Sequence, residues 1–264
     1  MSSYVTIAVF ISGAPFGNIN IVMMKIIDKI LRPTPTSLLV GQTIAQISVI
    51  PMFFIGTPVT WAICAFMYFG IMTFGITMGY HRYWSHYSFK CSKWLEYVMM
   101  FFAHIMMVGP ALAWVAQHRE HHIHADTDKD PHSPEYQGFI RCYYSQVMSL
   151  PKMWYVKKDL LRNELCKTQH RYYWHFILLF GVCLFLIDPY AVIYAWLAPA
   201  GFAKLIGSLV FIHSHRGGKP RSDYWLGLVT FGEGFHAKHH DEPWSWDFHP
   251  WDIGGKIIRL LKNA

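Results

Sequence analysis

Charged side chains are missing from two long stretches of this 264-residue chain. No Asp, Glu, Lys or Arg occurs between Pro33 and Tyr80, and Asp188 is the only one between Tyr172 and Ala203. A helix that crosses a bilayer needs about 20 predominantly apolar residues. The first stretch is long enough for two crossings, and the second provides the greater part of two more, so the pattern excludes an ordinary water-soluble domain and predicts an all-α integral membrane protein.

Other features that would indicate a different class of protein are also missing. The five cysteines form no CxxC pair and their number is odd, which argues against a disulfide framework. No repeat of roughly 20 to 50 residues divides the chain, so we expect a single domain over residues 1–264. The net charge of +7 comes without a nucleic-acid-binding motif. Attraction to membrane lipids with anionic headgroups accounts for this charge, and no nucleic-acid partner is expected.

The apolar stretches divide into two predicted helical hairpins. Gly56-Thr57-Pro58 separates spans near 38–55 and 59–79, and Asp188-Pro189 separates spans near 173–187 and 191–212. Basic residues precede and follow each hairpin, whereas the short turns carry none. Because basic residues mark the cytoplasmic side of a membrane protein, we expect a multi-pass protein with both termini in the cytoplasm.

Eight of the sixteen histidines fall into three tight clusters. These are HRYWSH (His81 and His86), HREHH (His118, His121 and His122) and HAKHH (His236, His239 and His240). Residues three and four apart lie on one face of an α-helix. In each triplet the i and i+4 imidazoles can therefore bind one metal ion while the i+3 imidazole reaches a second. Two facing triplets predict two metals. The pair in HRYWSH is five apart, so the helix should end or bend inside that motif.

The apolar segment 95–115 lies between the first and second histidine clusters. A crossing there would place the two clusters in opposite compartments, where they could not share a metal centre. We therefore predict an interfacial or re-entrant helix, helped by Gly109-Pro110, and four full spans with every histidine cluster in a cytoplasmic cap. The segment up to Ile30 lacks a basic region before its apolar run, which argues against a cleaved signal peptide. An amphipathic helix on the membrane surface is expected instead.

Imidazole ligands alone do not identify the metals, because neutral imidazole suits iron, zinc, copper and nickel. A structural zinc site closes with four ligands, and eight histidines exceed that number. No hydrolytic nucleophile motif accompanies the clusters. A metal pair at the end of an apolar helical bundle therefore favours redox chemistry on a lipid, in which the metal carries the hard chemistry and the protein positions the chain.

The three clusters also resemble motifs of a known family. GITMGYHRYWSH, HREHH followed by DPHSP, and TFGEGFHAKHH are similar to the histidine boxes of membrane fatty-acyl desaturases, in particular the stearoyl-CoA (delta-9) group and its bacterial and cyanobacterial relatives. The resemblance runs from about Gly75 to the carboxyl terminus. It implies four spans, a cytoplasmic cap and a diiron enzyme that uses dioxygen and two electrons to introduce a cis double bond into a saturated acyl chain.

Carried over by position, the resemblance assigns nine histidines to two iron ions. One iron would take His81, His86, His118, His122 and His239, and the other would take His121, His236, His240 and a ninth ligand near the end of the last span. His215 fits the family spacing to Gly218, and His213 is the alternative. Phe211 stands where the family has an asparagine that contacts the iron through water. Trp114 matches a substrate-binding position in the acyl tunnel, although an aromatic residue at helical spacing is equally often a core residue.

Further polar residues near the motifs have expected roles. Metal-bound histidines usually donate their second ring N–H to a carboxylate or carbonyl, so the nearby acidic residues are candidate partners, with a solvated surface role as the alternative: Glu120, Asp126, Asp130, Glu233 and Asp241. Six other histidines are expected in loops, interfaces or hydrogen bonds rather than on metal: His104, His124, His132, His170, His175 and His249.

Two departures from the family leave the acyl carrier open between CoA, a lipid and a carrier protein. Ala116 replaces a basic residue that contacts the CoA phosphates in the animal enzymes, and the run 140–144 (IRCYY) replaces the usual His and Trp. No haem-binding HPGG segment and no flavin or nicotinamide fingerprint occurs. A separate ferredoxin or b-type cytochrome with its reductase is therefore expected to supply electrons, docking on the basic face.

Two hypotheses compete with this interpretation, and the second belongs to a different class of protein. A membrane hydroxylase or monooxygenase of alkyl or lipid substrates would use similar boxes, although DPHSP and GEGFH favour desaturation. A non-catalytic membrane metal-binding protein or transporter would need polar residues along an ion path inside the spans, and the predicted spans have almost none. Zinc in a purified sample would not exclude iron, since zinc outcompetes ferrous iron at most nitrogen sites.

Overall fold

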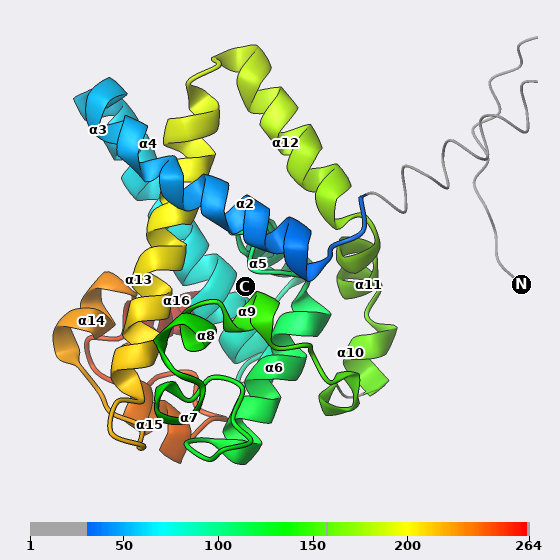
Figure 1. The fold of residues 1–264 in the computed structure, drawn as a ribbon, viewed down its shortest axis with the longest axis vertical. Helices are drawn as coiled ribbons and strands as arrows, with labels where there is room; N and C mark the ends of the chain where they lie inside the picture. Colours follow the sequence, from blue (N-terminus) through cyan, green and yellow to red (C-terminus); the bar gives the residue numbers. More distant parts are fainter. Residues whose placement is uncertain (1–30, 157, 263–264) are drawn as a thin grey trace, which may run out of the picture.

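The computed structural model describes residues 31–156 and 158–262, and all regular secondary structure in these ranges is helical. Long helices reach the upper end of the molecule in Figure 1, and short helices gather at the lower end. The predicted all-α fold is confirmed for the described residues. The amphipathic helix expected up to Ile30 lies outside them.

The first long pair contains α2 (Pro35–Ile47), α3 (Val49–Ile55), α4 (Pro58–Gly70) and the π-helix η1 (Ile71–Ser85). Thr34 and Thr57 each cap the following helix, because the threonine hydroxyl accepts a backbone N–H from the third helical residue and a proline stands in the first turn. Residues 35–55 and 58–85 are each long and apolar enough to cross a membrane. The second of these extends six residues beyond the predicted end at 79.

The second long pair contains α12 (Tyr173–Ile187), η3 (Ile193–Leu197) and α13 (Ala198–Ser214), which meet at the top of Figure 1. Residues 193–214 are long and apolar enough to cross a membrane. The helix α12 meets this criterion only together with α11 (Glu164–Arg171), from which it is bent by 73°. The described residues thus contain three candidate spans, or up to four if this bent pair is one span. The four-span topology stays a prediction.

Residues 95–115 are not one continuous helix but parts of two, broken beside the Gly109-Pro110 that was expected to help a re-entrant segment. That the segment is interfacial or re-entrant stays a prediction. α5 (Lys93–Ile105) and α6 (Ala111–His124) are separated by a turn in which Met107 and Gly109 adopt φ values of 61° and 103°. Buried side chains satisfy the backbone hydrogen-bonding groups of this turn. The Gly109 carbonyl accepts from the Tyr80 hydroxyl at 3.0 Å, and the Gly109 N–H donates to the Tyr173 hydroxyl at 3.1 Å. The turn is therefore held by distant parts of the chain.

Short helices build the lower end of the molecule. They are α7 (Pro134–Gln137), α8 (Phe139–Tyr143), α9 (Ser145–Met148), η2 (Met153–Tyr155), α10 (Lys158–Arg162), α14 (Tyr224–Val229), α15 (His236–Asp241) and α16 (Ile253–Leu261). A fully buried ion pair joins α16 to η1: Arg82 Nη1 lies 2.9 Å from Asp252 Oδ2. Arg82 also lies over the Phe248 ring. These contacts hold the carboxyl-terminal part of the chain against the first histidine cluster.

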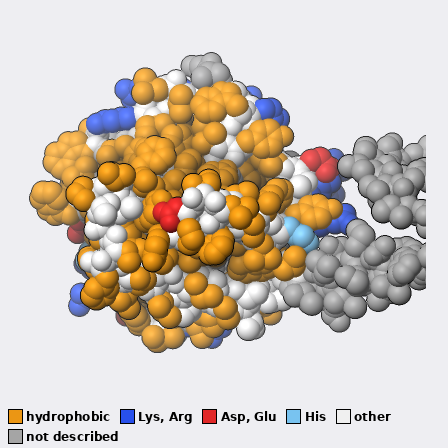
Figure 2. Space-filling view, turned by 90° about the horizontal axis from the view of Figure 1, so that it is seen from above, with side chains coloured by type: hydrophobic (Ala, Val, Ile, Leu, Met, Phe, Trp, Pro, Cys, Tyr) orange, Lys and Arg blue, Asp and Glu red, His pale blue; other side chains and the backbone are white. Residues whose placement is uncertain are grey.

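The opposite end of the molecule has an apolar surface. Phe54 is 84% exposed and Ile187 is 79% exposed, and charged side chains are sparse over this end in Figure 2. Soluble proteins rarely expose such a continuous apolar area. The distribution matches long helices whose outer faces contact lipid.

Candidate metal centre

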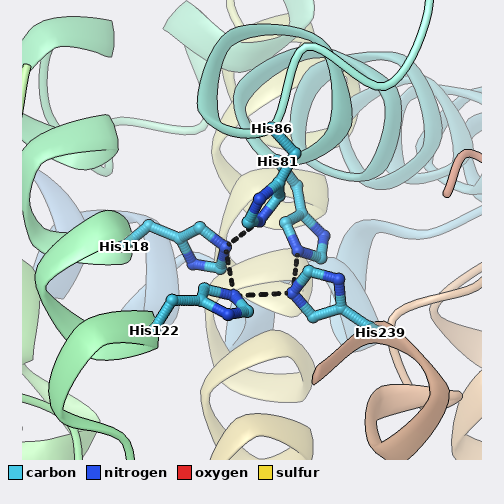
Figure 3. A group of neighbouring side chains, drawn as sticks. All are labelled: His81, His86, His118, His122 and His239. Carbon is cyan, nitrogen blue, oxygen red and sulfur yellow. Dashed lines mark hydrogen bonds between the residues drawn. The ribbon is translucent and has the colours of Figure 1, made fainter. Parts of the chain in front are cut away.

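Five histidines from three distant segments meet at the lower end of the helices. His81 and His86 come from the end of η1, His118 and His122 from α6, and His239 from α15. One ring nitrogen of each lies within 4.8 Å of the others, and the rings converge in Figure 3. The Nε2 atoms of His81 and His239 are 2.8 Å apart, as are those of His86 and His118.

The π-helix places the two histidines of the first cluster. In a π-helix the N–H of residue i+5 bonds the carbonyl of residue i, a widening that is frequent at functional sites. η1 ends at Ser85, and His86 follows as its carboxyl-terminal cap. The rings of His81 and His86 are 5.2 Å apart. The expectation that the helix ends inside HRYWSH is confirmed.

A second group contains His121 from α6, His215 at the end of α13, and His236 and His240 from α15. The Nε2 atoms of His215 and His236 are 2.7 Å apart, and those of His236 and His240 are 3.0 Å apart. His213 lies outside the group, with its side chain 51% exposed and 3.7 Å from Asp223. The two groups contain the same residues that the family resemblance assigned to two ions, with His215 rather than its alternative His213 in the second group.

Three carboxylates lie behind these histidines and accept their second ring N–H. The Nδ1 atoms of His81, His121 and His215 lie 2.9, 2.9 and 3.1 Å from Glu233, Asp130 and Asp126. Such a bond fixes the tautomer and leaves the Nε2 lone pair facing the shared space. Of the other two acidic candidates, Glu120 pairs with Lys152 and Asp241 is exposed.

Two metal ions fit this arrangement of donors. Burial holds the pKa values of His118, His121, His236 and His239 well below the usual value and lowers those of His122 and His240 to about 3 and about 2. The imidazoles are therefore neutral, which is the form that binds metal. Facing lone pairs at these separations repel one another unless a cation lies between them. A cation at the centre of each group would remove that repulsion.

A cavity extends from the two groups between the long helices. His118 and His236 line one part of it, and Met72, Ile76 and Met106 line another. Trp114 lines the cavity as well and stacks on His118 with ring centroids 4.8 Å apart. The predicted tunnel residue is thus beside both the cavity and the first group, and its contact with substrate stays a proposal.

Phe211 and His132 lie beside the second group of histidines but do not belong to it. Phe211, at the family's asparagine position, lines the cavity with its ring 4.9 Å from that of His215. His132, which was expected in a loop, does lie in one, but it is buried and its ring is 5.6 Å from that of His121. The DPHSP motif around His132 was the signal that could have placed it near the centre.

Lys204 is the cavity residue that the sequence reasoning missed. It lies inside the span predicted over 191–212, is 1% exposed and lines the cavity. A charged residue in the middle of an apolar helix is itself an indication of function, so the signal was present in the sequence. Another buried polar residue, His104, stacks on Tyr173 and bonds its carbonyl at 2.8 Å, as expected for a histidine in a hydrogen bond.

The fold and the two histidine groups define a membrane-type helical protein with a candidate dimetal centre, and comparison with known proteins identifies the family. Residues 57–251 match the family model for fatty acid desaturases. The chain belongs to this family and is an acyl desaturase.

Similar proteins come from plants, cyanobacteria and insects. The chain is 30% identical to delta-9 acyl-lipid desaturase 2 of Arabidopsis thaliana, over 75% of this chain and 68% of the relative. It is 26% identical to the sn-1 stearoyl-lipid 9-desaturase of Anabaena variabilis, over 71% and 74%. The acyl-CoA delta(11) desaturase of Spodoptera littoralis is 28% identical, over 77% of this chain and 67% of the relative.

Proposed function

We propose that this acyl desaturase is a diiron, dioxygen-dependent enzyme that introduces a cis double bond at the delta-9 position of a saturated acyl chain. The observation that carries the proposal is the pair of buried histidine groups beside a cavity between long apolar helices. The similarity to delta-9 acyl-lipid desaturases supports the position of the bond. When bound, the two irons would supply the activation of dioxygen and the oxidising power that an unstrained C–H bond requires.

The residues of this chain would hold, orient and shield the reacting groups. The nine histidines would bind the metals: His81, His86, His118, His122 and His239 on one ion, and His121, His215, His236 and His240 on the other. Glu233, Asp130 and Asp126 keep the proton on the far nitrogen of their histidines. The apolar cavity residues would hold the chain straight and exclude water.

Selection of one C–C bond would come from the walls of the cavity, because a saturated chain carries no polar group near the bond that reacts. Trp114 touches the first group and the cavity at once, so we assign it to substrate binding. Holding a methylene pair beside the metals supplies the proximity from which much of an enzyme's rate derives. Both electrons would come from a separate ferredoxin or b-type cytochrome.

The test is expression with a matched reductase and electron donor, followed by mass spectrometry of the fatty acids and measurement of iron. We expect a cis-9 monounsaturated product, about two irons per chain, and no product from His118→Ala or His240→Ala. A hydroxylated product would instead support the monooxygenase hypothesis. Supplying the acyl chain as a CoA thioester, a carrier-protein thioester or a glycerolipid in separate assays identifies the carrier.

A further inference from the structure

Two short helices form one wall of the cavity. We call α8 and α9, with the residues between them, the α8–α9 wall (residues 139–148). Its inner side chains Cys142, Ser145 and Gln146 line the cavity, whereas Phe139 and Ile140 on its outer side are 53% and 62% exposed. The wall therefore separates the cavity from an apolar outer surface. Helices of five and four residues have too few internal hydrogen bonds to be stable alone, so the wall depends on outside contacts.

Lys204 of α13 supplies two of these contacts and makes a third bond within its own helix. Its Nζ donates to the Tyr143 carbonyl at 2.7 Å and to Gln146 Oε1 at 2.9 Å, both in the wall. The third bond, to Ser208 Oγ at 2.9 Å, lies within α13. An ammonium group has three donors, so all of them are used. Among the described residues, no carboxylate lies within ion-pair distance of Lys204.

Because all three donors are used, these bonds indicate which part of the Lys204 side chain faces the cavity. With its ammonium group directed at the wall and at Ser208, the part left for the cavity is the aliphatic stem, as is common for buried lysines. A lysine inside an apolar helix is costly, and such residues are usually retained for a function. Here the ammonium group joins the wall to α13.

The opposite side of the wall is joined to α2. The Tyr143 hydroxyl donates to Gln46 Oε1 at 2.7 Å, and the neighbouring Gln42, which is fully buried, donates to the Met107 carbonyl at 3.1 Å. Met107 lies in the turn between α5 and α6, next to the cavity residue Met106. Hydrogen bonds thus link α13, the wall, α2 and this turn around the cavity.

We propose that Lys204 determines the product specificity of the enzyme by fixing the α8–α9 wall. This inference rests on the proposed function. The wall sets where the acyl chain can run, and the chain has no polar group to keep it in register. If the wall shifts outward, different methylenes reach the metal centre. Lys204 is thus a positioning residue, which acts on the chain through the wall.

The first test compares Lys204→Met with Lys167→Met. Methionine is of similar length and removes only the three bonds and the charge, and Lys167 is a half-exposed lysine paired with Glu164 outside the cavity. The readout is the distribution of double-bond positions and chain lengths among the products, which is independent of the yield. We expect the share of minor positional isomers to be several-fold larger in Lys204→Met than in the wild type. We expect no such increase in Lys167→Met. An unchanged distribution in Lys204→Met overturns the proposal.

A second readout needs no activity. Cys142 in the wall is 3% exposed, Cys64 on α4 is equally buried, and Cys183 is exposed. A membrane-permeant maleimide followed by peptide mass spectrometry should label Cys142 several-fold faster in Lys204→Met than in the wild type. Cys183 serves as the reference, and unlabelled Cys64 shows that the fold persists.

Equal labelling of Cys142 in the folded variant contradicts the proposal. If Cys64 also becomes labelled in Lys204→Met, Gln146→Leu gives the decision, since it removes from the wall one acceptor of the Lys204 ammonium group. A faster Cys142 reaction in that variant supports the proposal, and an unchanged one overturns it. A wild-type enzyme that forms no unsaturated product would contradict the proposed function, while the labelling comparison still tests the wall.

Discussion

At the scale of residues, the carboxylates behind the histidines decide which ring nitrogen faces the centre. Asp126 is the informative case, because it pairs with His215 and has a left-handed backbone with φ of 59°. Asparagine tolerates this backbone better than most residues. Asp126→Asn therefore changes the charge and leaves the turn intact.

We expect Asp126→Asn to weaken metal binding at the second group by about tenfold or more, the usual effect of removing such a partner. The measurement is the metal content after dialysis against a graded chelator. Asp241→Asn is the matched control, since Asp241 is exposed. Equal metal retention in the two variants would show that the carboxylate has no role in binding.

The buried histidines should make the metal-stripped protein sensitive to acid. Burial lowers the pKa of His122 to about 3 and that of His240 to about 2, whereas an unfolded histidine has a pKa of about 6.5. Between these values the unfolded chain binds protons that the folded chain does not. Stability therefore falls as the pH decreases below about 6.5, by at most about 1.4 kcal/mol per histidine per pH unit.

The check is the unfolding temperature of the stripped protein in detergent at pH 7.5 and pH 5. We expect a lower value at pH 5 and a smaller loss after zinc is added, because zinc binds the neutral rings of the folded state. A stripped protein that is equally stable at both pH values would argue against buried neutral histidines.

At the scale of elements, the Arg82–Asp252 pair joins η1 to α16. Both side chains are fully buried, and Asp252 also accepts the Phe248 and Gly255 N–H groups. Removing one partner of a buried pair leaves an uncompensated charge. Removing one partner of the Arg82–Asp252 pair is therefore expected to destabilise the fold far more than removing one partner of a surface pair.

We expect Asp252→Asn to lower the free energy of unfolding by about 3–5 kcal/mol. Asp247→Asn is the matched control, because its partner Arg259 is largely exposed at 3.4 Å, and such pairs contribute less than about 1 kcal/mol. Denaturant unfolding in detergent measures both. Similar losses of unfolding free energy in the two variants would contradict the expectation that the buried pair contributes more than the surface pair.

At the scale of the whole molecule, the turn between α5 and α6 bears on the topology. This pair of helices connects the first two histidine clusters, which meet in one centre. Its two ends should therefore lie in the same compartment. Lys93 at the start of α5 and Asp128 beyond α6 are exposed positions at those ends, and Tyr190 is an exposed position in the turn between α12 and α13.

A membrane-impermeant thiol reagent should label Lys93→Cys and Asp128→Cys from the same side and Tyr190→Cys from the other. Peptide mass spectrometry distinguishes each site from the native cysteines. This result is expected because the long helices between the two ends of the molecule carry no charged side chain other than the buried Arg82 and Lys204. Labelling of Lys93→Cys and Asp128→Cys from opposite sides would overturn the four-span topology.

Local periodicity made much of the site predictable from sequence. The i, i+3 and i+4 spacing of His118, His121 and His122 divides these residues between two groups in any α-helix, and the structure has this division. Long uncharged stretches likewise predicted the apolar helices, because a buried charge is costly whatever the neighbours are.

Only the tertiary structure decided the features that depend on distant contacts. His213 and His215 both lie at the end of α13, and packing buries one while the other stays exposed. The break between α5 and α6 is held by Tyr80 and Tyr173, which no local pattern connects to it. Lys204 was visible in the sequence as a charge in a span, but its partners in the α8–α9 wall lie about 60 residues away. Such pairings follow from how the helices pack, whereas spacing along one helix follows from the backbone alone.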